Sequence, residues 1–249
     1  MSAAPVHADN AAQAEYWNSV AGRRWTDRQE EQDLVLRPVS DRLIAAAGAK
    51  PGQRIIDVGC GCGDTTIDFA AVYEFEREWA DLAVSRFGVM FFADPARSFA
   101  NLRRGLKPGA RLVFACWREA KQNPWMMIPL REAKKHAPPL PETNPEDPGP
   151  FAFADEARVR RILSAAGFAD IVATPEDLDL DLAIGRGLDA AVAGALGIGP
   201  TSRILDGQPE AVRAAAAADI RKALAERAKG DSVPLGAAIW IVTATNPDR

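Results

Sequence analysis

The sequence is poor in cysteine and histidine, with three cysteines and two histidines among 249 residues. Cys60 and Cys62 are separated by one residue, and Cys116 lies far along the chain. An odd and unevenly spaced set of this kind argues against the disulfide framework of a small secreted domain. Neither His7 nor His136 has the spacing to these cysteines that a zinc site needs, so no metal site is predicted.

The sequence also lacks an excess of basic residues and any long apolar run. Its formal charge is −4 and its isoelectric point is about 5.4, an acidic balance that argues against a nucleic-acid partner. No apolar run approaches the length of a membrane span, which argues against a membrane partner. Residues 1–17 show neither the basic region nor the apolar core of a secretory signal. We therefore expect a cytoplasmic protein.

What is present is the composition of an ordinary globular protein, with 47% apolar and 26% charged residues. We expect residues 1–10 to form a disordered tail and residues 11–249 to form a single domain. The apolar periodicity over 11–50 predicts an N-terminal helical cap. Residues 118–152 are rich in proline and poor in periodicity, which indicates a lid or long excursion.

Apolar, β-branched runs alternate with helical patterns along the first half of the chain. The runs at 53–58, 81–92 and 110–117 predict strands. Helical patterns at 64–72 and 94–109 separate them, the second ended by a Lys-Pro-Gly sequence. This alternation predicts an α/β fold with a parallel sheet covered by helices on both faces.

The second half of the chain continues with a helix, a strand, further helices and a closing strand. The helix is expected over 155–168, where Asp155 is placed to cap it and Gly167 to end it. The remaining segments are expected as a strand over 170–180, helices over 187–197 and 209–230, and a final strand over 236–246.

The stretch "IDVGCGCGDTT", residues 56–66, places a glycine-rich loop between an expected strand and an expected helix. Such a loop lets a ligand approach the backbone, and the N–H groups of the helix point toward it. Gly59, Gly61 and Gly63 give a G-x-G-x-G pattern, whereas the dinucleotide fingerprint needs a glycine where Asp64 stands. The spacing therefore weakens the interpretation as a nicotinamide oxidoreductase.

The sequence "DVGCGCG" after "RII" resembles the first motif of class I S-adenosylmethionine-dependent methyltransferases. Residues 80–117 resemble the fourth strand, the following helix and the fifth strand of that family, and residues 236–246 resemble its closing antiparallel strand. The similarity is greatest to the small-molecule group related to the ubiquinone and menaquinone biosynthesis methyltransferases. The resemblance implies a Rossmann-like sheet with helices on both faces.

The resemblance also implies S-adenosylmethionine as the cofactor and assigns roles to residues of the glycine loop. Asp57 would orient the loop near the methionine end of the cofactor. The residues implied to wrap the methionine and the ribose are Gly59, Cys60, Gly61 and Gly63.

Residues that leave the next two strands are implied to lie near the reacting groups. Ser85 and Arg86 would sit beside the sulfonium and the substrate, although ordinary solvation of a strand end explains both as well. Large side chains that follow the third strand could line an apolar acceptor pocket or pack in the core; they are Trp117, Trp125, Met126 and Met127. The sequence identifies no catalytic residue.

The interval between Gly59 and Asp81 is too short for the family pattern. In the family, a second strand with a ribose-binding acid, a helix and a third strand come before the fourth strand. Roughly 35–45 residues are therefore absent, and we predict the junction near Val72–Tyr73. The sheet then lacks its second and third strands. The first strand becomes an exposed edge, from which self-association into a homo-oligomer is expected.

The function predicted from the sequence is S-adenosylmethionine-dependent methyl transfer to a small, partly apolar acceptor. The alternative is a non-catalytic binding protein with the methyltransferase fold that has lost part of its cofactor site.

Overall fold

The computed structural model describes residues 23, 26–59, 76–139, 144, 146–197 and 199–248. The tail expected at 1–10, the helix expected at 64–72 and the junction expected near Val72–Tyr73 lie outside these residues.

The described residues form a sheet of five strands in the order β1-β2-β3-β5-β4. The strands are β1 (Ile55–Asp57), β2 (Ala80–Arg86), β3 (Leu106–Trp117), β4 (Ala169–Asp181) and β5 (Pro234–Thr245). Strands β1, β2 and β3 are parallel, and β5 runs antiparallel between β3 and β4. The expected α/β class and the antiparallel closing strand are confirmed. In the described part of the chain, β1 is the last strand at its side of the sheet.

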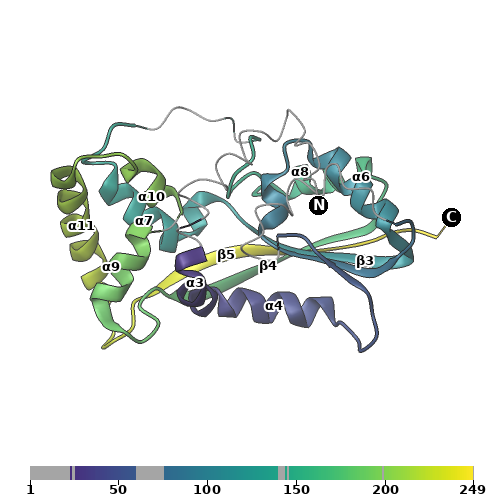
Figure 1. Cartoon of the computed structure of the whole chain (residues 1–249), viewed down its shortest axis with the longest axis horizontal. Coiled ribbons are helices and arrows are strands. Elements are labelled where there is room, and N and C mark those ends of the chain that lie inside the picture. Colours follow the sequence, from purple (N-terminus) through teal and green to yellow (C-terminus); the bar gives the residue numbers. More distant parts are fainter. Residues whose placement is uncertain are drawn as a thin grey trace.

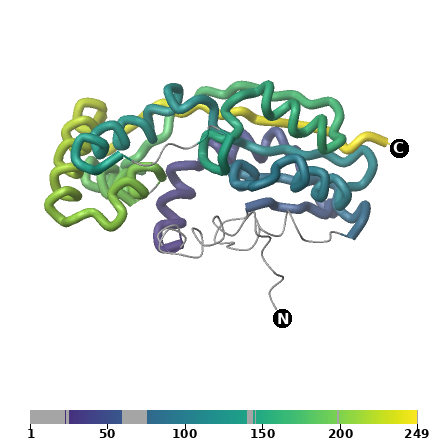
Figure 2. Tube along the Cα trace, turned by 90° about the horizontal axis from the view of Figure 1, so that it is seen from above, coloured from purple at the N-terminus to yellow at the C-terminus, as the bar shows by residue number. Residues whose placement is uncertain are grey.

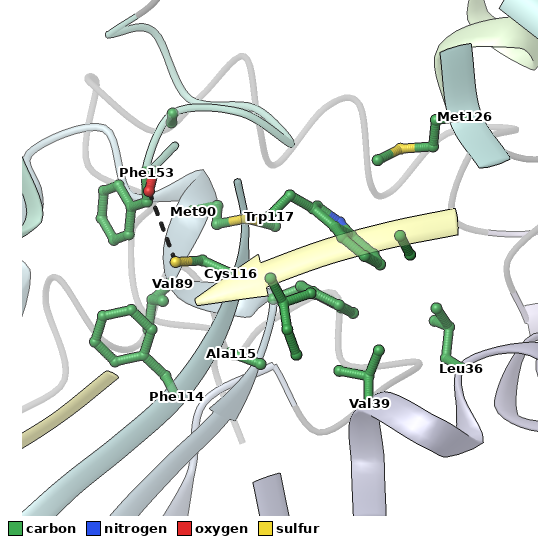
Figure 3. Packing of buried hydrophobic residues seen from close by; sticks show 14 of the residues in the cluster. Leu36, Val39, Val89, Met90, Phe114, Ala115, Cys116, Trp117, Met126 and Phe153 are labelled. Atoms are coloured by element: carbon green, nitrogen blue, oxygen red, sulfur yellow. Dashed lines mark hydrogen bonds between the residues drawn. The ribbon is translucent and has the colours of Figure 1, made fainter. Parts of the chain in front are cut away.

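Helices cover both faces of this sheet (Figure 1). One face carries α3 (Gln29–Val35) and α4 (Arg37–Ala47), which meet at Leu36. The other face carries α6 (Pro95–Gly105) and α8 (Glu156–Ala165). Apolar side chains of β3 fill the space between these layers, and Figure 3 shows part of that core.

A group of helices lies beyond one end of the sheet and is called the helical lobe here. It consists of α7 (Pro124–Ala133), α9 (Gly187–Gly197), α10 (Gly199–Leu205) and α11 (Glu210–Ala225). Figures 1 and 2 show the lobe extending the molecule along its longest axis. Helix α7 lies within residues 118–152, so a segment expected to be an irregular excursion contains a packed helix. Within the described ranges, no helix is long and apolar enough to cross a membrane.

Local sequence signals place two helix starts correctly. The Asp94 carboxylate accepts a hydrogen bond from the N–H of Arg97 at 3.0 Å, and Pro95 is the first residue of α6. The Asp155 carboxylate likewise caps α8. In both cases the aspartate supplies an acceptor for N–H groups that have no partner inside the first turn.

The expected end of α6 is wrong. The helix ends at Gly105, and the Lys107-Pro108-Gly109 sequence belongs to β3. The side-chain amide of Asn246 donates hydrogen bonds to the carbonyls of Leu106 (2.9 Å) and Lys107 (3.0 Å). Because these hydrogen bonds come from a residue far along the chain, the sequence around Gly105 does not show that the helix ends there.

Candidate functional site

Two glycine turns meet where β1 and β2 end. Gly59 has a φ of 82°, and a Cβ atom on it would lie 2.8 Å from the Cα of Gly88. A Cβ atom on Gly88 would lie 2.6 Å from the carbonyl oxygen of Val58. Only glycine fits at either position, because the two backbones are already in contact. Sequence reasoning identified Gly59 and missed Gly88, although a glycine shortly after a buried strand was the available signal.

The hydroxyl group of Ser85 links these two turns through hydrogen bonds. Its side chain is fully buried, and its hydroxyl donates a hydrogen bond to the carbonyl of Val58 at 2.6 Å. The same oxygen accepts a hydrogen bond from the N–H of Val89 at 3.3 Å. The hydroxyl is therefore used inside the protein, at the base of the site.

Arg86 connects the end of β2 to the N-terminal helices. Its Nη1 donates to the hydroxyl of Ser40 on α4 at 3.0 Å, and its Nη2 pairs with the carboxylate of Asp33 on α3 at 2.6 Å. The guanidinium group is half-buried. It therefore holds α3 and α4 against the carboxyl edge of the sheet.

Asp57 is the last residue of β1 and is exposed at the side of the sheet. Neighbouring protein atoms still remove part of the hydration of its carboxyl group, which raises the pKa of Asp57, and the positive charge of Arg86 opposes this rise. The arrangement sets an acidic group beside the Gly59 turn, with a compensating cation close enough to act on it.

A row of aromatic rings, Phe87, Trp117 and Trp125, runs from this edge toward the helical lobe. Phe87 stacks on Trp117 with ring centroids 4.1 Å apart, and the centroids of Trp117 and Trp125 are 5.1 Å apart. Phe87 has a φ of 72°, which is strained for a residue with a large side chain. Figure 3 shows Trp117 within the surrounding core. The sequence indicated both tryptophans but not Phe87.

The remaining residues of the predicted loop, Cys60, Gly61 and Gly63, lie outside the described residues. Cys116 is buried in β3, and burial raises the pKa of its thiol. Across the described ranges, no group of three or more histidine, cysteine, aspartate or glutamate side chains is placed to hold a metal ion.

The sheet order, the antiparallel β5 and the helices on both faces define a Rossmann-like α/β protein of the methyltransferase fold. A candidate type II methyltransferase from Anaeromyxobacter dehalogenans matches with a TM-score of 0.50 and 16% identity, over 84% of this chain and 97% of that chain. At this level of identity the likeness shows the fold alone.

Two further solved structures are similar. A methyltransferase from Thermotoga maritima, described as S-adenosylmethionine-dependent, matches with a TM-score of 0.47 and 13% identity, over 91% of this chain and 98% of that chain. Phosphoethanolamine N-methyltransferase 2 of Haemonchus contortus, crystallised with S-adenosylmethionine, matches with a TM-score of 0.48 and 12% identity, over 98% of this chain and 61% of that chain. No family model and no curated protein matches the sequence.

Proposed function

We propose that this protein transfers a methyl group from S-adenosylmethionine to a small, partly apolar acceptor. The observation that carries the proposal is the meeting of the Gly59 and Gly88 turns beside Asp57, at the carboxyl edge of adjacent parallel strands. Ligands of open α/β sheets bind at this edge. The cofactor supplies an electrophilic methyl group on a sulfonium, and the protein's task is to align the acceptor and exclude water.

The side chains at this edge fit the cofactor in part. The exposed carboxylate of Asp57 can accept hydrogen bonds from an ammonium or hydroxyl group. Ser85 and Arg86 are better explained as positioning residues, because both already bond to protein groups. Cys60, Gly61 and Gly63 are proposed as contacts to the cofactor because the loop resembles the first motif of the methyltransferase family.

The aromatic row supports a partly apolar acceptor. Flat apolar rings favour an apolar neighbour, and their faces attract a sulfonium cation. Helix α7 carries Trp125 at the end of this row, so we propose that residues 118–152 form the acceptor side of the site and act as its lid. We also propose that the protein belongs to the small-molecule quinone-biosynthesis group and that it is cytoplasmic.

We further propose that the chain lacks the family's second and third strands. The acid that binds the ribose and the segment beside the adenine would then be missing. A hydrogen bond to a charged group contributes roughly 1.5–3 kcal/mol, so their loss should weaken cofactor binding by at least ~3 kcal/mol. This corresponds to more than about a hundredfold in affinity.

Calorimetric titration with S-adenosylmethionine tests this account. We expect weak or undetectable binding by the 249-residue chain and micromolar binding by a version in which the interval near Val72–Tyr73 is refilled from a methyltransferase of the same fold. Micromolar binding by both proteins would show that the interval is dispensable. If the refilled protein does not bind either, the alternative of a non-catalytic binding protein replaces the methyltransferase proposal.

A further inference from the structure

A small apolar cavity lies where the helical lobe meets α3. Its volume is about 40 Å³. The residues that line it include Val35, Trp125, Met126, Pro129, Leu182, Gly194 and Thr201. The cavity therefore joins helices from distant parts of the sequence.

The size and lining of the cavity define what can occupy it. An engineered cavity of about 150 Å³ accepts the six carbons of benzene, so a volume about a quarter as large accepts about one or two carbon atoms. A water molecule needs two to four polar partners, and most of these walls are apolar. The cavity thus favours a short alkyl group over water.

One residue that lines the cavity, Trp125, has a buried polar atom without a partner in the described part of the chain. Among the described residues, nothing accepts a hydrogen bond from the indole Nε1 of Trp125, although that atom is shielded from solvent. Buried donors are almost always satisfied, so an orphaned one calls for an explanation. A ligand oxygen would satisfy it.

The position of Trp125 links the cavity to the proposed reaction site. Trp125 lines the cavity and also forms the end of the aromatic row, which begins at Phe87 beside the Gly88 turn. The row of rings therefore connects the carboxyl edge of the sheet to the cavity.

We propose that the cavity binds the apolar tail of a small ligand, an alkyl group of about one or two carbons, and that a neighbouring carbonyl or hydroxyl oxygen accepts a hydrogen bond from Trp125 Nε1. That this ligand is the methyl acceptor rests on the proposed function. Binding in the cavity itself does not.

The first experiment uses the unaltered protein with ¹³C-labelled methionine methyl groups. Xenon and butan-2-one serve as probes, the first apolar and the second carrying both a two-carbon tail and an acceptor oxygen. We expect both probes to shift the methyl resonance of Met126, which lines the cavity. Met90 is the internal control, because it is buried elsewhere in the core, as Figure 3 shows. An unmoved Met126 resonance, or equal shifts at Met90, would overturn the proposal.

Substitution of the donor tests the hydrogen bond. Trp125→Phe should weaken butan-2-one binding about tenfold and should not weaken xenon binding, because xenon uses no donor and the smaller ring does not reduce the cavity. Thr201→Val, which removes the other buried polar side chain of the wall, should leave both affinities within about twofold. If Thr201→Val weakens binding of the ketone tenfold and Trp125→Phe does not weaken it, Trp125 Nε1 is not the donor of the hydrogen bond.

Gly194→Ala provides a variant that is expected to fold well. A Cβ atom there meets only the carbonyl of Leu182 within 4 Å, at 3.8 Å, and alanine favours the helix. The added methyl group reduces the cavity, so binding of both probes should fall at least about fivefold while the protein becomes no less stable. Unchanged binding would contradict the cavity as the site.

These outcomes are separable from the proposed function. If the refilled protein fails to bind S-adenosylmethionine but the unaltered protein shows the Met126 shifts, the chain has the ligand cavity without the proposed reaction. If the refilled protein binds the cofactor but the unaltered protein lacks those shifts, the chain has the reaction site without this cavity as its acceptor pocket.

Discussion

At the scale of single residues, the site depends on glycines whose surroundings differ. Gly52 and Gly59 have nearly the same φ, 84° and 82°. A Cβ atom on Gly52 would meet nothing within 4 Å, whereas on Gly59 it would meet the Cα of Gly88. The pair therefore separates backbone strain from the contact between the two turns.

We predict that Gly52→Ala lowers the free energy of unfolding by roughly 1–2 kcal/mol, the cost of a left-handed conformation. Gly59→Ala should lower it by at least about 2 kcal/mol more, since the turns must also separate. Urea unfolding with an unchanged slope measures both. Equal losses in the two variants would show that the Gly59–Gly88 contact adds no constraint.

Two fully buried serines offer a second comparison. Ser85 bonds to Val58 and Val89, whereas the hydroxyl of Ser98 in α6 has no partner among the described residues. Ser85→Ala should cost about 1–3 kcal/mol of unfolding free energy, because it leaves buried backbone groups unpaired. Ser98→Ala should be neutral or stabilising, because it removes an unsatisfied hydroxyl and favours the helix. Thermal unfolding of both variants checks the prediction, and a similar loss in each would refute it.

At the scale of elements, the sequence predicted those parts whose cause is local. Asp94 and Asp155 supply caps that a sequence pattern reveals. The end of α6 was misplaced because Asn246 acts from a distant position. Helix α7 was not predicted, because Pro124 and Pro129 suggest an irregular segment. In the structure Pro124 is the first residue of the helix. Pro129 lies inside it and is tolerated because α7 packs against the other helices of the lobe.

The contact between α7 and α11 should depend on pH. A hydrogen bond from His136 lowers the pKa of Asp219, and a hydrogen bond from Lys135 is the main cause that lowers the pKa of Glu132. A carboxyl group whose pKa falls on folding stabilises the protein above its unfolded pKa of about 4. That stability is lost as the pH falls through the lower folded pKa.

We therefore predict that Asp219→Asn lowers the urea midpoint at pH 7 and lowers it less at pH 3, because the stability from the native carboxylate is lost as the pH falls toward its lowered folded pKa. Asp41→Asn is the control, because Asp41 forms only an exposed pair within α4. Its effect should be small at both values. A loss in Asp219→Asn that is the same at pH 3 and pH 7 would contradict an ionic role for Asp219.

At the scale of the whole molecule, the two outer strands of the described sheet differ. Strand β4 carries Pro175 and a series of acidic residues, features that protect a sheet edge from pairing. Strand β1 is short and exposes Ile55. The family resemblance predicted the antiparallel closing strand, but it could not reveal the helical lobe, which depends on contacts between α7 and helices inserted between β4 and β5.

We predict that the protein self-associates through β1. Ile55→Lys should weaken association roughly tenfold, about 1.4 kcal/mol, because lysine disfavours pairing at an edge. Val172→Lys on β4 is the matched control, since the two side chains are 39% and 50% exposed. Sedimentation equilibrium over a range of concentrations measures both. Equal weakening by the two variants would place the interface elsewhere.

Strand β5 lies between β3 and β4, although it is the last of the described strands in the sequence. During synthesis on the ribosome, β4 therefore emerges long before the strand that joins it to the rest of the sheet. Until residues 234–245 leave the exit tunnel, both β3 and β4 present an unpaired side. Translation speed over the last helices thus sets how long the nascent chain is exposed to aggregation and to chaperone binding.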